Sequence, residues 1–139
     1  MSKKMLFLFA LILFYTISTK CCSIKKIPKN EQEQIVHIAK EQLGKPYVYG
    51  GHNPKKGFDC SGLVYYTFQE MDISTPRVSR DFVNFGTAVP LSEAEKGDII
   101  IFKDTNPKKK QAGHVGIVIS EKDAPLKFAL VRFALVKLD

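Results

Sequence analysis

The stretch Gly57–Tyr66 places Cys60 between an aspartate and a serine, directly before a run with helical periodicity. Asp59 is a natural N-cap residue, so Cys60 is predicted to be the first residue of a helix. A thiol there lies at the positive end of the helix dipole, which favours its reactive thiolate form. A buried structural cysteine is the competing interpretation, and position alone gives the two similar weight. The helix is indicated by largely apolar side chains at three- and four-residue spacing, namely Leu63, Val64, Thr67, Phe68 and Met71.

The chain has the length and composition of a single globular domain. It has 139 residues, of which 45% are hydrophobic and 25% are charged. Its formal net charge is +7, and three of these charges are lysines within residues 1–20, which hold no acid, so +4 remains for the rest. This excess suits an anionic surface such as cell wall or lipid head groups. No arginine-rich helix or basic–aromatic alternation indicates nucleic acid.

Residues 1–20 have the plan of a secretion signal. Lys3 and Lys4 precede the unbroken apolar run Met5–Phe14, which is too short for a permanent transmembrane helix. The alternative is a buried core helix, but two lysines before an apolar segment at the N-terminus favour export. We therefore predict that the protein is exported.

Cys21 and Cys22 follow this segment directly and suggest a lipoprotein signal, in which a cysteine becomes the lipidated N-terminus. Lys20 stands where such signals usually carry a small residue, so ordinary cleavage after Ser18 stays open. Adjacent cysteines do not bridge each other, and no disulfide framework is predicted. Residues 21–29 are predicted to be a polar and basic tether.

Residues 30–139 are predicted to form one α+β domain. A helix begins at Asn30, a loop with two tyrosines follows, and a short helix capped by Ser79 comes after the cysteine helix. Two apolar runs, 99–102 and 113–119, are then typical of strands. Helices followed by strands favour a helical layer packed on an antiparallel sheet. The first helix carries an apolar stripe of Ile35, Ile38, Ala39 and Leu43.

A thiolate nucleophile needs a base that accepts its proton, and histidine suits this role near neutral pH. His114 opens the second predicted strand, which can hold an imidazole steady. His52 is a competing base on a loop, and His37 is interpreted as a surface-boundary residue of the first helix. The histidines and Cys60 show no zinc-like spacing, so no metal is expected.

Five motifs follow one another along the chain at plausible intervals. They are Pro46-Tyr47-x-x-Gly50-Gly51, Phe58-Asp59-Cys60-Ser61-Gly62-Leu63-Val64, Pro76-Arg77-x-Ser79-Arg80, Gly97-Asp98 and Gly113-His114-Val115-Gly116-Ile117. Together they resemble the NlpC family of papain-like cysteine peptidases, which trim bacterial cell-wall peptides. The resemblance runs from about Asn30 to Ile119.

The resemblance implies a peptidoglycan endopeptidase that cuts the γ-D-glutamyl–diaminopimelate bond of stem peptides. Cys60 would be the nucleophile and His114 the general base. The implied partners are peptidoglycan stem peptides and, through a lipid anchor, the membrane; no cofactor, nucleic acid or obligate protein partner is implied. The implied fold is papain-like, with the cysteine helix packed on the sheet that carries the histidine. The implied substrate contacts are Tyr47 near the scissile carbonyl, Asp59 and Ser61 at the free N-terminus of the peptide, and the pair Ser79 and Arg80.

The chain departs from the family pattern near its C-terminus. A third catalytic residue usually orients the imidazole and stands in a phrase like Phe-x-His, whereas the corresponding phrase here is Phe128-Ala129-Leu130. Leucine cannot hydrogen-bond the ring, so we expect a domain that is short or altered at its C-terminus. Two alternatives stay open: a catalytically impaired domain that still binds cell-wall peptides, and a papain-like amidase or acyltransferase that uses the same Cys–His pair.

Overall fold

A computed structural model describes residues 27–104, 108, 112–121, 124–125 and 127–129. Along these ranges the three-stranded sheet follows the α-helices, with two short strands between the first helix and the second, and the fold is of the predicted α+β class, with helices on an antiparallel sheet. The helical elements are α2 (Lys29–Glu41), α3 (Cys60–Gln69) and the short 3-10 helices η1 (Ser79–Asn84) and η2 (Leu91–Glu93). The strands are β1 (His52–Asn53), β2 (Gly57–Phe58), β3 (Ile99–Lys103), β4 (Ala112–Val118) and β5 (Phe128–Ala129).

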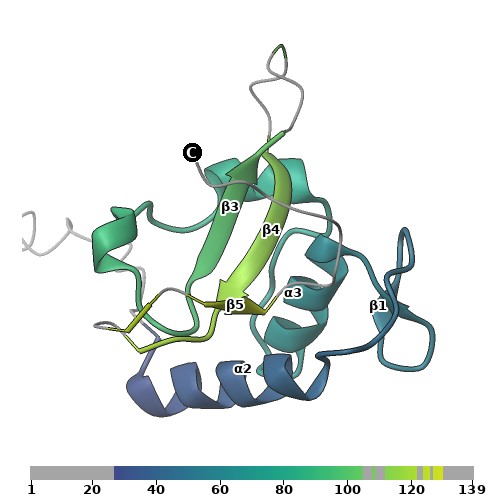
Figure 1. The fold of residues 1–139 in the computed structure, drawn as a ribbon, viewed down its shortest axis with the longest axis horizontal. Helices are drawn as coiled ribbons and strands as arrows, with labels where there is room; N and C mark the ends of the chain where they lie inside the picture. The colour runs from purple at the N-terminus through teal and green to yellow at the C-terminus, as the bar shows by residue number, and fades with distance from the viewer. Residues whose placement is uncertain (1–26, 105–107, 109–111, 122–123, 126, 130–139) are drawn as a thin grey trace, which may run out of the picture.

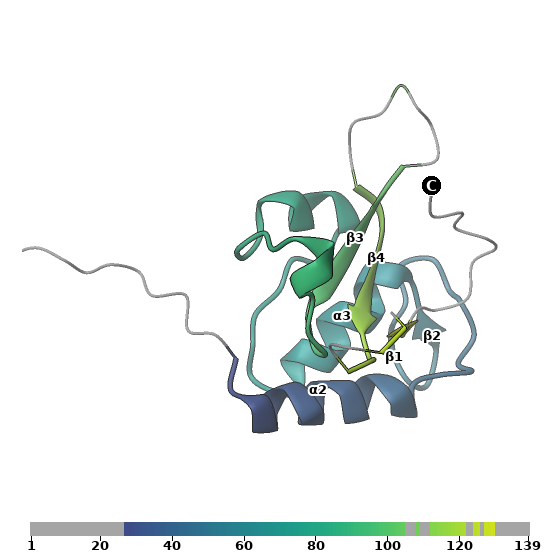
Figure 2. The same cartoon turned by 60° about the vertical axis from the view of Figure 1, so that its left-hand side comes forward.

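Strand β4 lies in the middle of the larger sheet, whose order among the described residues is β3-β4-β5. It runs antiparallel to both neighbours, and its Ile117 lies opposite Ile99 on β3 and Ala129 on β5. Helix α3 packs beside β4, and α2 lies across one end of the sheet and of α3 (Figures 1 and 2). The helix that begins with Cys60 therefore rests against the strand that carries His114.

The hydrophobic core lies where these two helices meet the sheet. β-branched side chains of β4 suit this position because they pack well on a pleated surface. Burial of these apolar side chains is the main force that holds α2 and α3 on the sheet. The buried core cluster consists of Ile35, Ala39, Phe58, Leu63, Val64, Phe68, Phe82, Val115, Ile117 and Ala129.

Helix α2 follows the predicted stripe at first and then ends earlier than expected. Ile35 and Ala39 are fully buried, as predicted, but Leu43 is 49% exposed. The prediction for Leu43 was wrong because the helix ends at Glu41, so helical periodicity no longer directs the side chain to the core. His37 lies on the exposed face, with its Nε2 3.3 Å from Oε1 of Glu41.

The small β1–β2 ladder was not predicted from the sequence. His52 pairs with Phe58, and Asn53 pairs with Gly57, in antiparallel register. The side chain of Asn53 shapes the intervening turn, since its Oδ1 accepts hydrogen bonds from the backbone N–H groups of Lys55 (3.2 Å) and Lys56 (2.9 Å). Two-residue strands carry too little alternation to be recognised by periodicity.

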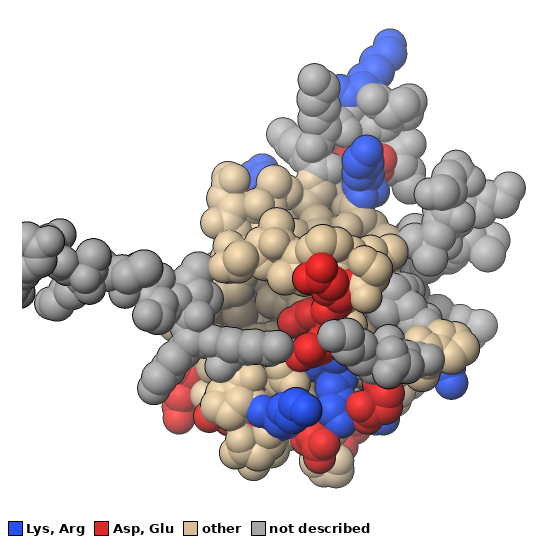
Figure 3. Space-filling model, turned by 90° about the vertical axis from the view of Figure 1, so that its left-hand side faces the viewer, with Lys and Arg blue, Asp and Glu red and all other residues tan. Residues whose placement is uncertain are grey.

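A lysine between η2 and β3 connects α2 to the end of β4. The Nζ of Lys96 donates hydrogen bonds to Oε1 of Glu33 (2.9 Å) and Oε1 of Glu121 (2.8 Å). The hydrogen bond and the positive charge of Lys96 lower the pKa of Glu33. Figure 3 shows the face on the left of Figure 1, where acidic and basic side chains gather over the lower part, the middle is largely uncharged, and further basic side chains lie at the top.

The predicted secretion signal at residues 1–20 and the two cysteines after it lie outside the described residues, as does Leu130. Among the helices that the structure describes, none combines the length and the hydropathy needed to cross a membrane.

Candidate active site

Cys60 occupies the predicted position at the start of α3. The N-cap is Asp59, whose Oδ1 accepts a hydrogen bond from the backbone N–H of Gly62 (2.6 Å). This bond satisfies one of the N–H groups that the first helical turn leaves without a partner. Cys60 itself is half-buried, and its thiol is free rather than in a disulfide.

The loop before the helix lies in close contact with the first turn of α3. The backbone N–H of Asp59 donates to the carbonyl oxygen of Gly51 (2.9 Å), which brings that oxygen against Gly62. A Cβ atom on Gly62 would collide with this oxygen, so only glycine fits there. Gly51 of the double glycine and Gly62 of the cysteine motif therefore take part in the same backbone contact.

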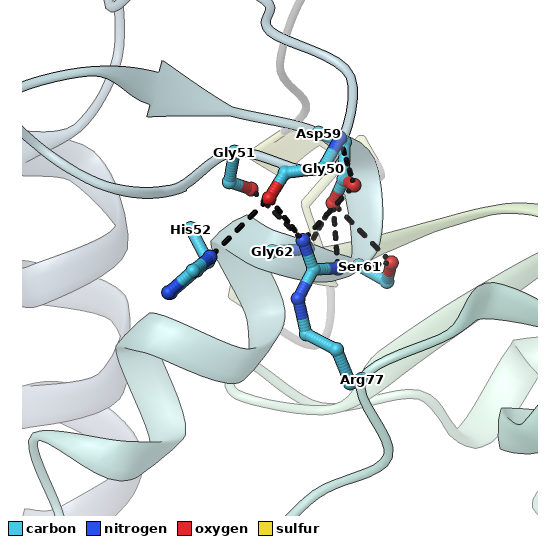
Figure 4. A network of polar contacts seen from close by, with 7 residues as sticks. All are labelled: Gly50, Gly51, His52, Asp59, Ser61, Gly62 and Arg77. Atoms are coloured by element: carbon cyan, nitrogen blue, oxygen red, sulfur yellow. Dashed lines mark hydrogen bonds and ion pairs between the residues drawn. The ribbon is translucent and has the colours of Figure 1, made fainter.

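Arg77 closes this arrangement from the connection between α3 and η1 (Figure 4). Its Nη1 and Nη2 lie 3.0 Å and 3.1 Å from the two carboxylate oxygens of Asp59, a bidentate ion pair. Nη2 also donates to the carbonyl oxygen of Gly50 (2.8 Å), and Nη1 to Oγ of Ser61 (3.2 Å). One guanidinium thus connects the N-cap, the first turn of α3 and the loop that contains Gly50 and Gly51, called the glycine loop below.

Opposing effects act on the thiol of Cys60. Burial raises its pKa and is the largest effect, and the negative charge of Asp59 raises it further. The backbone N–H groups of Val115, Ser61 and Cys60 itself lower it, and the net pKa lies above the ordinary value of 9.0. The sequence-based expectation of a stabilised thiolate was therefore wrong for the free protein, because desolvation outweighs the helix N-terminus. The contribution of Val115 places the sulfur beside β4.

His114 precedes Val115 on β4, at a β-bulge. Phe102 pairs with His114 and Lys103 pairs with Ala112, so Gly113 is the extra residue. A bulge redirects the side chains next to it, and bulges recur beside active sites. The imidazole lies beside the ring of Phe102, with the ring centroids 6.0 Å apart, and its burial lowers the pKa of His114.

Tyr47 lies in the same neighbourhood. It forms a parallel bridge with Phe58, next to the cysteine motif, and it packs against the core together with Cys60. Burial raises the pKa of Tyr47, and the nearby charges of Cys60 and Asp59 raise it further. The structure thus brings Tyr47, Asp59, Cys60 and Ser61 together, with the backbone of β4 next to His114 alongside.

Three other sequence candidates have surroundings that differ from the expected ones. Arg80 is 66% exposed and its Nε lies 3.7 Å from Oδ1 of Asp81. Ser79 is the first residue of η1 rather than its cap; the N-cap is Val78, without a side-chain hydrogen bond. His52 is exposed, and its Nδ1 lies 3.2 Å from the carbonyl oxygen of Gly50.

Arg77 is the residue of this site that the sequence reasoning missed. Its motif was recognised, but a substrate role was assigned to Ser79 and Arg80 and none to Arg77. The sequence held at most a partial signal, an acidic N-cap beside the cysteine, because a carboxylate that becomes buried on folding requires a cation nearby. In the described part of the chain, no group of three or more histidine, cysteine or acidic side chains is placed to hold a metal ion.

Comparison with known proteins agrees with this arrangement. The family model of the NlpC/P60 family matches residues 44–125, which include both Cys60 and His114. The murein DD-endopeptidase MepH of Escherichia coli is 39% identical over 82 residues, covering 57% of this chain and 30% of that protein. The gamma-DL-glutamyl hydrolase of Bacillus subtilis is 49% identical over 71 residues, covering 51% of this chain and 17% of that protein. The chain thus spans less than a third of either relative.

Solved structures show the same fold. An NLP/P60 family protein of Staphylococcus aureus, described as similar to lipoprotein, superposes with a TM-score of 0.63 and 28% identity, over 87% of this chain and 42% of that one. The NlpC/p60 domain of the peptidoglycan hydrolase SagA gives a TM-score of 0.56 and 27% identity, over 72% of this chain and 89% of that one. The fold is accordingly papain-like, and the chain belongs to the NlpC/P60 family.

Proposed function

We propose that this protein is a peptidoglycan endopeptidase in which Cys60 is the nucleophile and His114 the general base. The observation that carries the proposal is the position of the thiol at the start of α3, against the backbone N–H of Val115 and therefore one residue from His114. Membership of the family and the endopeptidase names of its relatives support hydrolysis of cell-wall peptides.

The shifts in the pKa values of Cys60 and His114 favour a general-base mechanism. Burial raises the pKa of Cys60 and lowers that of His114, so both groups rest in their neutral forms near pH 7. In the proposed reaction the sulfur bonds to the carbonyl carbon of the scissile amide while its proton passes to the imidazole. The imidazolium then protonates the departing amine, which leaves a thioester on Cys60. Water hydrolyses the thioester to a carboxylate and restores the thiol.

The proposed substrate is the stem peptide of peptidoglycan, cut at the γ-D-glutamyl–diaminopimelate bond. Tyr47 is proposed to lie near the scissile carbonyl, because it bridges Phe58, which precedes the cysteine by two residues, and packs against the same core as Cys60. The free N-terminus of the peptide is assigned to Asp59 and Ser61, and further contacts to Ser79 and Arg80. The corresponding location is the cell envelope, with residues 1–20 as the signal and a lipid anchor at Cys21 or Cys22.

The test is hydrolysis of purified peptidoglycan and of a synthetic γ-D-glutamyl–diaminopimelate peptide. The wild-type protein should release a new amine, and mass spectrometry of the fragments identifies the cut bond. Cys60→Ala should abolish release, since attack through the sulfur provides the whole covalent route. Matching circular dichroism spectra and melting curves show that both proteins are folded. A folded wild type that releases nothing contradicts the proposal.

A domain that binds stem peptides without cutting them is the second candidate. Leu130 stands where the family has its orienting residue, and loss of such a residue costs on the order of 10³- to 10⁴-fold in rate. A muropeptide pull-down that survives Cys60→Ala, together with no turnover by the wild type, would support this candidate. A product cut at another amide or ester would instead indicate an amidase or acyltransferase.

A further inference from the structure

Arg77 contacts several groups around the start of α3. Beyond its two bonds to Asp59, its Nη2 lies 2.8 Å from the carbonyl oxygen of Gly50 and 3.3 Å from that of Gly51. Its Nη1 lies 3.2 Å from Oγ of Ser61. The planar guanidinium presents its donors in a fixed geometry, so these contacts fix the relative positions of the groups that they join.

The charge of Arg77 also matters to its neighbours. The Asp59 side chain is only 12% exposed, and a buried carboxylate without a cation is costly. The charge of Asp59 acts directly on the adjacent thiol, where it opposes formation of a thiolate. A guanidinium at 3.0 Å offsets that charge, so removing it would expose Cys60 to the full carboxylate.

The titratable and charged groups around the sulfur come from four parts of the chain. Asp59 is the N-cap of α3, and Tyr47 belongs to the loop before β1. His114 lies on β4 next to Val115, and Arg77 comes from the connection that precedes η1. Arg77 is the cation among these groups that forms an ion pair with Asp59.

We propose that Arg77 is a positioning residue: it holds the N-cap, the glycine loop and the first turn of α3 together and offsets the charge of Asp59 beside Cys60. This proposal rests on the proposed function of Cys60 as the nucleophile. Arg77 acts through Asp59 and the backbone, without touching the substrate.

The experiment measures the rate at which iodoacetamide alkylates Cys60 as a function of pH, without substrate. The full chain carries Cys21→Ser and Cys22→Ser, so that Cys60 is its only thiol. In this background, Arg77→Gln should move the midpoint of the pH profile upward. At pH 7.5 alkylation should slow by about tenfold, which corresponds to one pKa unit. A merely structural role would change the melting temperature but leave the midpoint in place.

Two further variants serve as controls for this experiment. Arg80→Gln removes an arginine three residues away that does not contact Asp59, and the midpoint should stay at the wild-type value. Adding Asp59→Asn to Arg77→Gln removes the uncompensated charge and should return the midpoint towards that of the wild type. An unchanged or lowered midpoint in folded Arg77→Gln overturns the proposal.

If Arg77→Gln does not fold, the pH profile of Arg77→Lys is compared with that of the wild type instead. This variant keeps the cation but lacks the planar set of donors. We then expect a midpoint near that of the wild type and slower alkylation at every pH, because the contacts to Gly50 and Gly51 are reduced. A profile identical to the wild type overturns the proposal. Alkylation requires no peptidase activity, so a shifted midpoint in a protein that cuts no peptidoglycan would refute the proposed function alone.

Discussion

A Cβ atom on Gly113, at the bulge in β4, would lie 2.5 Å from the Cα atom of Asp104, the residue that follows β3. Contacts this short do not occur in folded proteins, and the obstacle is backbone rather than a flexible side chain. Gly113→Ala should therefore displace the bulge and the neighbouring His114. We expect a loss of about 2 kcal/mol or more in the free energy of unfolding, measured by urea denaturation.

Gly44→Ala is the matched control. A Cβ atom on Gly44 would meet no other atom within 4 Å, but the φ of +87° at this position disfavours any residue except glycine. This backbone strain alone should cost about 1 kcal/mol, without effect on the site. Equal losses in the two variants would show that the contact with Asp104 is relieved without cost.

Asp59 combines a helix cap with an ion pair, and two substitutions separate these roles. Asp59→Asn keeps a good N-cap but removes the charge opposite Arg77, whereas Asp59→Ala removes both. Asp59→Ala should be less stable than Asp59→Asn by about 1 kcal/mol in urea denaturation, the typical contribution of a cap. If the two unfold at the same urea concentration, the bond to Gly62 contributes nothing to the stability of α3.

His114 should make the stability of the protein depend on pH below neutrality. Burial lowers its pKa in the folded state, so the unfolded chain takes up a proton first as the pH falls below about 6.5. The free energy of unfolding contributed by this group is therefore intact above that pH and falls as the pH falls, by at most about 1.4 kcal/mol per pH unit. Comparing wild type with His114→Asn at pH 7.5 and pH 5.5 measures the effect.

The control for this experiment is His37→Asn, because His37 is exposed and lies on α2, away from the sheet. At pH 7.5 it should unfold at the same urea concentration as the wild type. Equal pH dependence of the wild type and His114→Asn would mean that the imidazole is hydrated as well in the folded protein as in the unfolded chain.

Phe58 should be among the most sensitive core positions. Its ring is fully buried and lies 5.4 Å from the ring of Tyr66, centroid to centroid. Phe58→Ala should cost about 3–5 kcal/mol in urea denaturation. Phe85→Ala removes the same atoms from a side chain that is 40% exposed and should cost clearly less. Similar losses would argue against a core centred on Phe58.

Local signals in the sequence were sufficient for the cysteine helix. Asp59 as N-cap and Cys60 as first residue were confirmed, because capping chemistry depends on neighbouring residues. The two apolar runs became β3 and β4 within a residue of the predicted bounds, and the α+β class followed from the order of elements.

Features that depend on contacts between distant segments could not be predicted in this way. The ion pair of Arg77 with Asp59 and the close approach of Gly113 to Asp104 leave no periodic pattern in the sequence. The pKa of Cys60 was misjudged because the helix N-terminus is visible in the sequence, whereas the burial of the thiol is not.

The glycine loop and the first turn of α3 are close in sequence, and their contacts, from Val48 with Phe58 to Asp59 with Gly62, span ten residues or fewer. The contact of the thiol with the backbone of Val115 on β4 joins residues much farther apart in the chain. Local contacts form before distant ones during folding, because short loops cost less entropy to close. A newly made chain should therefore assemble the turn around Cys60 while the sulfur is still open to solvent, and oxidants would reach it most easily in that interval.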